Sequence, residues 1–242
     1  MHPSMKENAA GTGILYLVAT PIGNLEDITL RAIRILKEVD LIAAEDTRRA
    51  KKLLGHYQIT TPVTSYFAHS STRKTQSLLT QIRDGSSIAL ISEAGTPSIS
   101  DPGYALTRLA IDQNIPVVPV PGPAALIAAL SASGLPTRSF IFEGFIPRKS
   151  GRRKNLFLAL RDQPRTFILY ESPYRVMATL EDLRAVLGEG RRIVIAREMT
   201  KLYEEFMRGT IAEVITALTG RSIKGEVTIV VSGCAPEEEP LH

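Results

Sequence analysis

Two carboxylates and two guanidinium groups occur in one short segment, Ala44-Glu45-Asp46-Thr47-Arg48-Arg49. A carboxylate can donate or accept a proton, so Glu45 and Asp46 are candidates for acid or base chemistry. A structural role is the alternative, because Asp46 also suits the N-cap of a following helix, which would leave Arg48 solvated. The segment follows an apolar run, and strand ends are where ligands bind in α/β folds, which favours a functional role.

A second group of residues suits the binding of a small polar ligand. The turn from Ser92 to Gly103 and the segment Pro121-Gly122-Pro123 are rich in Gly, Pro and small hydroxyls, and Glu93 lies in the first of them. Gly permits close backbone approach, Pro opens a helix, and helix N-termini offer unpaired N–H donors. Neither a Gly-x-Gly-x-x-Gly nor a Gly-Lys-Ser/Thr phosphate loop occurs, which disfavours a Rossmann dehydrogenase and a P-loop NTPase.

A basic run follows in the second half of the chain, with five cations around a glycine. They are Arg148, Lys149, Arg152, Arg153 and Lys154. Such a run can neutralise the phosphates of an RNA or DNA backbone, and a solvated basic loop is the alternative. The run has no interleaved aromatic residue, so we expect it to hold the backbone and not to read bases.

The segment Glu171-Ser172-Pro173-Tyr174-Arg175 reads mostly as the start of a helix, with Ser172 as the cap and Pro173 at the first helical position. The start of a helix does not explain the charged residues Glu171 and Arg175, and a structural ion pair between them would account for both. The four histidines show no metal-ligand spacing, so we expect no metal centre.

Apolar strands alternate with amphipathic helices along the first half of the chain, which predicts a parallel sheet with helices on both faces. The expected strands cover residues 14–19, 40–45, 61–66, 87–92 and 116–120, and the helices 28–39, 47–55, 70–84, 102–114 and 123–134. The turns after Ala19, Glu45, Ser92 and Val120 then meet at one edge of the sheet.

The pattern changes at Leu135-Pro136-Thr137, which predicts a boundary there. Two closely spaced strands before a late helix indicate a mixed sheet in the second half. We therefore expect a leader at 1–12, an α/β domain at 13–135, a second α/β domain at 136–233 and an acidic tail at 234–242. The expected strands of the second domain cover residues 140–145, 165–170, 192–197, 205–208 and 226–232, and its helices 152–160, 173–187 and 211–218.

The composition limits the class of protein. The chain has 242 residues, 44% of them apolar, a formal charge of +4 and one cysteine. The length and apolar share allow a core of good size, and a single cysteine allows no intramolecular disulfide. The positive charge mildly favours anionic partners. The sequence shows neither a membrane-spanning run nor a secretory signal, so we expect a cytoplasmic protein.

Several of these motifs together closely resemble the ribosomal RNA small subunit methyltransferase I family of the tetrapyrrole methylase superfamily. The resemblance covers about Gly13 to Gly233. The segments that carry it are Leu17 to Leu25, Ala44 to Arg48, Glu93 to Pro97, Ser100 to Gly103, Pro119 to Pro123 and Glu143 to Phe145.

The resemblance implies a two-domain class III methyltransferase fold, a homodimer, and S-adenosylmethionine held in the cleft between the domains. It implies methylation of the 2′-hydroxyl of a cytidine in the decoding region of 16S rRNA. By position, the implied cofactor-binding residues are Pro21, Ile22, Thr96, Ser98, Ile99, Gly122, Ala125, Leu126 and Gly225. An alkyl hydroxyl is a poor nucleophile, so the candidates for removing its proton are Glu45, Asp46, Glu93 and Lys224.

Two positions depart from the pattern. Thr96 replaces the aspartate of the superfamily's Gly-Asp-Pro loop, which argues against a tetrapyrrole substrate, and Tyr174 stands where family members often carry histidine. Arg48, Arg49 and the basic run are the expected RNA-binding residues. A tetrapyrrole methyltransferase and a nonenzymatic RNA-binding factor are the competing functions.

Overall fold

The structure is a computed structural model that describes residues 11–234. The expected leader at 1–12 and tail at 234–242 lie almost entirely outside the described residues. The chain divides between Ala124 and Ala125 into two compact units. The expected boundary at 135/136 lies later in the chain than this division, because the helix α5 (Ala125–Ser131) packs against strands of the second unit.

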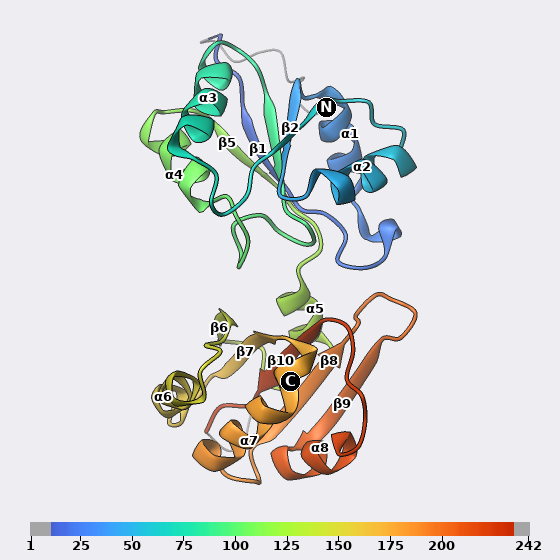
Figure 1. The fold of residues 1–242 in the computed structure, drawn as a ribbon, viewed down its shortest axis with the longest axis vertical. Coiled ribbons are helices and arrows are strands. Elements are labelled where there is room, and N and C mark those ends of the chain that lie inside the picture. Colours follow the sequence, from blue (N-terminus) through green and yellow to red (C-terminus); the bar gives the residue numbers. More distant parts are fainter. Residues whose placement is uncertain (1–10, 235–242) are drawn as a thin grey trace. The chain divides into compact units, whose positions relative to one another are not determined.

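The first unit is a five-stranded parallel sheet with helices on both faces (Figure 1). In sheet order, its strands are β3 (Val63–Ser65), β2 (Leu41–Ala44), β4 (Ile88–Ile91), β1 (Leu15–Val18) and β5 (Val117–Val120). The apolar sequences of β1, β2 and β4 suit burial on both faces, whereas the edge strand β3 is Val-Thr-Ser and partly exposed. Pro119 cannot donate a ladder hydrogen bond, and it lies in β5 at the edge of the sheet, where that is tolerated.

Two hydrophobic clusters hold this sheet between its helices. The helices α1 (Leu30–Glu38) and α2 (Thr47–His56) cover one face, with Leu36 and Leu54 buried against it. The helices α3 (Thr72–Arg83) and α4 (Tyr104–Asp112) cover the other face, with Leu79 and Leu106. Full burial of each such side chain contributes about 1.5–3 kcal/mol. This packing fixes the strand ends from which the site loops leave.

The second unit contains a mixed five-stranded sheet. In sheet order, its strands are β6 (Phe140–Phe145), β7 (Thr166–Glu171), β10 (Val227–Val231), β8 (Arg192–Arg197) and β9 (Glu205–Thr210). The first pair is parallel, and the other three pairs are antiparallel. The predicted fold class, with a parallel sheet in the first half and a mixed sheet in the second, is confirmed.

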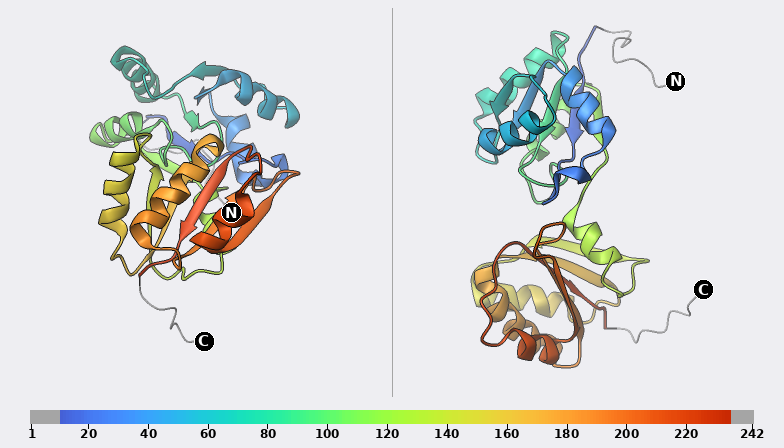
Figure 2. Two further views of the ribbon diagram at one scale, coloured as in Figure 1. Left: turned by 60° about the horizontal axis from the view of Figure 1, so that its bottom comes forward. Right: turned by 90° about the vertical axis from the view of Figure 1, so that its right-hand side faces the viewer.

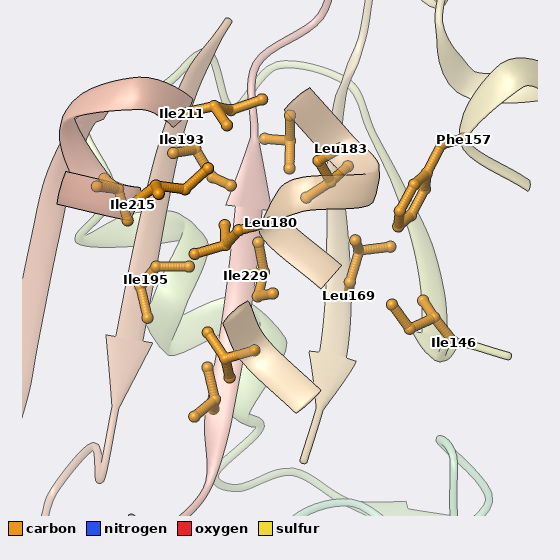
Figure 3. Packing of buried hydrophobic residues seen from close by; sticks show 14 of the residues in the cluster. Ile146, Phe157, Leu169, Leu180, Leu183, Ile193, Ile195, Ile211, Ile215 and Ile229 are labelled. Atoms are coloured by element: carbon orange, nitrogen blue, oxygen red, sulfur yellow. The ribbon is translucent and has the colours of Figure 1, made fainter. Parts of the chain in front are cut away.

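Three helices cover one face of the second sheet, and they lie side by side in the left view of Figure 2. They are α6 (Ser150–Leu160), α7 (Val176–Leu187) and α8 (Ile211–Leu218). Figure 3 shows how Phe157, Leu180 and Ile215 of these helices meet Leu169 and Ile229 of the strands. A short 3₁₀ helix, η2 (Pro173–Arg175), precedes α7.

Candidate functional site

Loops from three strand ends are joined to one another in the first unit. The Thr20 N–H donates to the Gly95 carbonyl oxygen at 2.9 Å, and the Gly95 N–H donates back to Thr20 at 2.9 Å. The Thr96 hydroxyl donates to the Pro123 carbonyl oxygen at 3.1 Å. The turns after β1, β4 and β5 therefore form one surface, as the strand ends of a parallel sheet predict.

The surface is built from residues with little or no side chain. A Cβ atom at Gly122 would lie 2.9 Å from the Cβ atom of Ala19, which is closer than real Cβ contacts. Gly95 has φ +86°, and a Cβ atom there would lie 3.5 Å from the Ile22 side chain. Three residues from the predicted cofactor set, Ile22, Thr96 and Gly122, are thus close to one another, with Pro21 beside them in sequence.

The loop after β4 is strained between Gly95 and Gly103. Gly95, Ser98, Ser100 and Gly103 all have positive φ angles, of +86°, +71°, +61° and +138°. Positive φ is costly for serine, and such strain concentrates at functional sites. The Ser98 hydroxyl is buried without a hydrogen-bond partner among the described residues, and Ile99 next to it is exposed. Ser98 therefore has an unused polar group in the loop predicted to hold a ligand.

Three carboxylates, those of Glu45, Glu93 and Asp101, lie in the loops that follow β2 and β4. Burial, together with the charges of Glu45 and Glu93, raises the pKa of Asp101 to about 6 against a partial offset from the Ser92 hydroxyl. Burial also raises the pKa of Glu45, which accepts a hydrogen bond from the Glu93 N–H at 3.4 Å. Glu93 forms an ion pair with Arg49. Raised pKa values suit groups that take up a proton near neutral pH.

Asp46 has a structural role instead. Its carboxylate accepts hydrogen bonds from the N–H groups of Arg48 at 2.7 Å and Arg49 at 3.3 Å, which makes it the N-cap of α2. These backbone hydrogen bonds lower the pKa of Asp46. A lowered pKa makes a carboxylate a weaker proton acceptor, so the capping alternative describes Asp46 better. The Arg48 side chain is largely exposed.

The remaining predicted cofactor and catalytic residues lie in the second unit. Ala125 and Leu126 begin α5, and the Leu126 N–H donates to the Tyr170 hydroxyl at 3.1 Å. Gly225 has φ +86°, and a Cβ atom there would overlap the Glu198 side chain. The side chain of Lys224 is exposed, and its carbonyl oxygen accepts a hydrogen bond from Arg197 at 3.3 Å.

The basic run divides into exposed and buried members. Arg148, Lys149, Arg152 and Lys154 are exposed at the start of α6. Arg153 is 3% exposed and pairs with Asp182, which also accepts a hydrogen bond from Ser150 at 3.0 Å. This corrects the expectation for Arg153, whose guanidinium stabilises the unit internally. Its spacing in sequence gave no sign of this, because the partner comes from α7.

Asp101 is the residue that sequence reasoning missed. The segment Ser100-Asp101-Pro102-Gly103 reads as a polar turn, and nothing in it signals that the carboxylate is partly buried beside Glu45 and Glu93. Among residues 11–234, no group of His, Cys, Asp and Glu side chains is arranged to hold a metal ion. Within the same part of the chain, no helix is both long and apolar enough to cross a membrane.

Comparison with known proteins gives the class to which this fold and site belong. Residues 14–215 match the family described as Tetrapyrrole (Corrin/Porphyrin) Methylases. The fold is similar to that of a cobalt precorrin-4 methyltransferase, with a TM-score of 0.66, 16% identity, and 96% of this chain and 98% of that chain covered. A diphthine synthase gives a TM-score of 0.70 at 14% identity, with 91% and 90% covered.

Curated relatives narrow the class. Ribosomal RNA small subunit methyltransferase I of Synechocystis sp. is 53% identical over 94% of this chain and 82% of its own length. The proteins of the same name from Halalkalibacterium halodurans and Escherichia coli O157:H7 are 50% and 47% identical, over 94% and 95% of this chain and 78% and 81% of their own lengths. The chain belongs to the ribosomal RNA small subunit methyltransferase I family of the tetrapyrrole methylases.

S-adenosylhomocysteine is the product left when S-adenosylmethionine has given up its methyl group. Gly122→Ala is expected to weaken the binding of this product about tenfold, because the new methyl group would push apart the ends of β1 and β5. Isothermal titration calorimetry measures the affinity. Gly55→Ala in α2 is the matched control, because nothing lies within 4 Å of a Cβ atom there. Equal affinities of the two variants would contradict the role given to Gly122.

Proposed function

We propose that this protein is an S-adenosylmethionine-dependent methyltransferase of 16S ribosomal RNA that modifies the 2′-hydroxyl of a cytidine in the decoding region. The observation that carries the proposal is the identity of about half of all residues, across nearly the whole chain, with small subunit rRNA methyltransferases I. The cytidine and the ribose oxygen come from the family resemblance and are the finer part of the proposal.

The residues of the first unit fit the proposed cofactor. S-adenosylmethionine, when bound, supplies a methyl group activated by a positively charged sulfur. Its amino-acid part and ribose need partners at close range, and the close backbone packing at Gly95 and Gly122 suits such an approach. We assign binding to Pro21, Ile22, Thr96, Ser98, Ile99 and Gly122, and from the second unit to Ala125, Leu126 and Gly225.

The carboxylates supply the proton acceptor that transfer to a hydroxyl needs. In such a transfer the ribose oxygen would bond to the methyl carbon as the methyl–sulfur bond breaks and leaves S-adenosylhomocysteine, so the proton of that hydroxyl must go to an acceptor. Glu45 and Asp101 have raised pKa values, so they fit the uptake of this proton better than Asp46 does. Glu93 is proposed to hold Arg49 in place through their ion pair. Lys224 stays a candidate from the second unit.

Transfer of a labelled methyl group tests the proposal. The purified protein is incubated with methyl-labelled S-adenosylmethionine and with small ribosomal subunits, naked 16S rRNA or a tetrapyrrole in separate reactions, and the RNA is then digested to nucleosides. Label in 2′-O-methylcytidine is the expected result. Label in a tetrapyrrole and none in RNA would favour a tetrapyrrole methyltransferase, and RNA binding without label would favour a nonenzymatic RNA-binding factor.

The exposed cations are proposed to hold the RNA backbone. They are Arg48, Arg49, Arg148, Lys149, Arg152 and Lys154. Replacing the four in the second unit by alanine should flatten the salt dependence of RNA binding, by roughly 0.7 in log–log slope for each phosphate that the protein no longer neutralises. Filter binding across a salt series measures the slope.

A quadruple variant of cations on α1 and α3 serves as the control for net charge: Arg31, Lys37, Arg73 and Arg83, each replaced by alanine. An equal loss of slope in the two quadruple variants would mean that net charge matters and the position of the basic run does not. The homodimer and the cytoplasmic location remain part of the proposal, and light scattering of the purified protein tests the first.

A further inference from the structure

A bulge in the edge strand β6 turns two aromatic side chains toward the same neighbour. The register between β6 and β7 shifts between Phe142 and Gly144, and Gly144 has φ +65°. Positions three apart in a regular strand point to opposite faces. Here Phe142 and Phe145 both contact Tyr170, with ring centroids 5.0 Å and 5.5 Å apart. The extra residue of the bulge therefore fixes the direction of Phe145.

Two large aromatic residues are left exposed where β6 and β7 end. Phe145 is the last residue of β6 and is 64% exposed, even though it contacts Tyr170. Tyr174 follows the end of β7 by three residues and is 94% exposed. The strands β6 and β7 are parallel neighbours (Figure 1), so residues at and just after their carboxyl ends belong to the same edge of the sheet.

The basic run follows Phe145 closely in sequence, and a buried side chain connects it to α7. The basic run begins with Arg148, three residues after Phe145. The Arg153 guanidinium donates both to the Arg148 carbonyl oxygen at 3.4 Å and to the Ala178 carbonyl oxygen at 3.3 Å, in the first turn of α7. One buried side chain thus ties the basic run to the helix that begins just after Tyr174. The sequence alone, which separates the run from Tyr174 by 20 residues, gives no sign of this connection.

Arg175 has one guanidinium nitrogen in an ion pair and one without a partner in the described part of the chain. Its Nη2 atom pairs with the buried Glu171 carboxylate at 2.5 Å, which confirms the expected ion pair. Glu171 is held in turn by the Ser172 N–H at 2.6 Å and the Thr179 hydroxyl at 2.7 Å. Among the described residues, the buried Nη1 atom of Arg175 has no hydrogen-bond partner. The ion pair with Glu171 therefore anchors the loop that carries Tyr174.

We propose that this edge binds unpaired RNA nucleotides, with bases stacked on Phe145 and Tyr174 and phosphates held by Arg148, Lys149 and Arg152. Exposed aromatic rings among cations are the combination that binds single-stranded nucleic acid. The inference rests on the proposed function and adds base contact to it. It also revises the expectation that the basic run meets the RNA backbone without aromatic residues nearby.

Tryptophan fluorescence provides a direct test, because the natural chain contains no tryptophan. Tyr174→Trp places the only indole of the protein at this edge. Adding a single-stranded cytidine oligonucleotide of about ten nucleotides should quench its emission, and a duplex of the same length should quench it less. Tyr203→Trp is the matched control: Tyr203 is 68% exposed in the same unit, in a loop beside the acidic residues Glu198 and Glu204. Equal quenching in the two variants, or none at position 174, would overturn the proposal.

Affinity separates stacking from a merely structural role. Tyr174→Leu and Phe145→Leu should each weaken oligonucleotide binding roughly 5- to 100-fold, while Tyr174→Phe stays within about twofold of the natural protein. Fluorescence anisotropy of a labelled oligonucleotide gives these values, and circular dichroism checks folding. Leucine variants that keep full affinity, or that change the oligomeric mass instead, would contradict the inference.

The binding measurements need neither cofactor nor methyl transfer. A protein that stacks bases but transfers no methyl group would contradict the proposed function alone. A protein that methylates RNA but shows no quenching at position 174 would contradict the stacking surface alone.

Discussion

Asp182→Ala is expected to lower the free energy of unfolding of the second unit by about 3–5 kcal/mol, since it leaves the Arg153 charge buried without its partner. The Arg153 and Asp182 side chains are 4% and 9% exposed. Asp182 also accepts the Ser150 hydrogen bond at the start of α6, so its loss should loosen the first turn of that helix. Urea denaturation followed by circular dichroism measures the change.

Asp162→Ala is the matched control for this loss. Asp162 is 80% exposed and pairs with Arg161 at the surface, where an ion pair contributes little. Comparable losses for the two aspartates would contradict the importance given to burial. A variant that is too unstable to purify can be replaced by Asp182→Asn, which keeps the shape of the side chain and should show the same direction of change.

The pH dependence of stability gives a second check. Burial raises the pKa of Asp182, but hydrogen bonds from Arg153 and Ser150 outweigh it, so the pKa is lowered overall. A carboxylate whose pKa is lower in the folded state stabilises the fold above its unfolded pKa, about 3.9. That contribution is lost as the pH falls through the folded pKa. The natural protein and Asp182→Asn should therefore differ most near neutral pH and converge in acid.

Asp101→Asn is expected to lower the rate of methyl transfer about 10²- to 10⁴-fold, the range typical of a lost proton acceptor. Asparagine keeps the shape and polarity of the side chain but cannot take up a proton. Because the pKa of Asp101 is raised to about 6, the rate of the natural protein should rise with pH through that value as the carboxylate ionises. Single-turnover methylation of small subunits with saturating cofactor measures both effects.

The same substitution should make the protein more stable at pH 8. An aspartate whose pKa rises on folding destabilises the folded state once the pH exceeds its unfolded pKa, and the full cost applies above the folded pKa. Removing that charge should return about 1–2 kcal/mol after solvent screening is allowed for, and nothing below about pH 4. Lost activity without gained stability would argue that Asp101 orients a loop instead of carrying a charge.

Glu45→Gln separates the two candidate proton acceptors. If Asp101 accepts the proton, Glu45→Gln should keep most of the rate and lower the pH at which the rate rises, because the Glu45 charge raises the Asp101 pKa. If Glu45 accepts the proton, Glu45→Gln should lose more of the methyl-transfer rate than Asp101→Asn does. Unchanged rates in both variants would remove these carboxylates from the proposed mechanism.

The strands and helices follow closely from the sequence, because apolar periodicity directly reflects burial. The β5 strand is predictable despite Pro119, and the sheet tolerates that proline at its edge. The unit boundary is less predictable. A break in pattern after α5 does not show which sheet that helix packs against, and α5 packs against β10 and β7 of the second sheet.

The site is predictable where chemistry is local and unpredictable where it depends on distant partners. Glycine and proline in the turns indicate close backbone packing, which Gly122 and Gly95 show. The burial of Arg153 depends on Asp182, 29 residues further along the chain. The raised pKa of Asp101 depends first on burial and then on the charge of Glu45, 56 residues before it. Such pairs form only when strands and helices pack together.

Glu45 and Asp46 have different roles, and this affects how the activities of alanine variants in this loop should be interpreted. Removing Asp46 takes away the acceptor for two N–H groups at the start of α2 and so displaces Arg49, the partner of Glu93. Removing Glu45 leaves that helix start intact. Both variants can lose activity for unrelated reasons, so two neighbouring acidic residues would score alike in a screen although one shapes the backbone and the other carries charge.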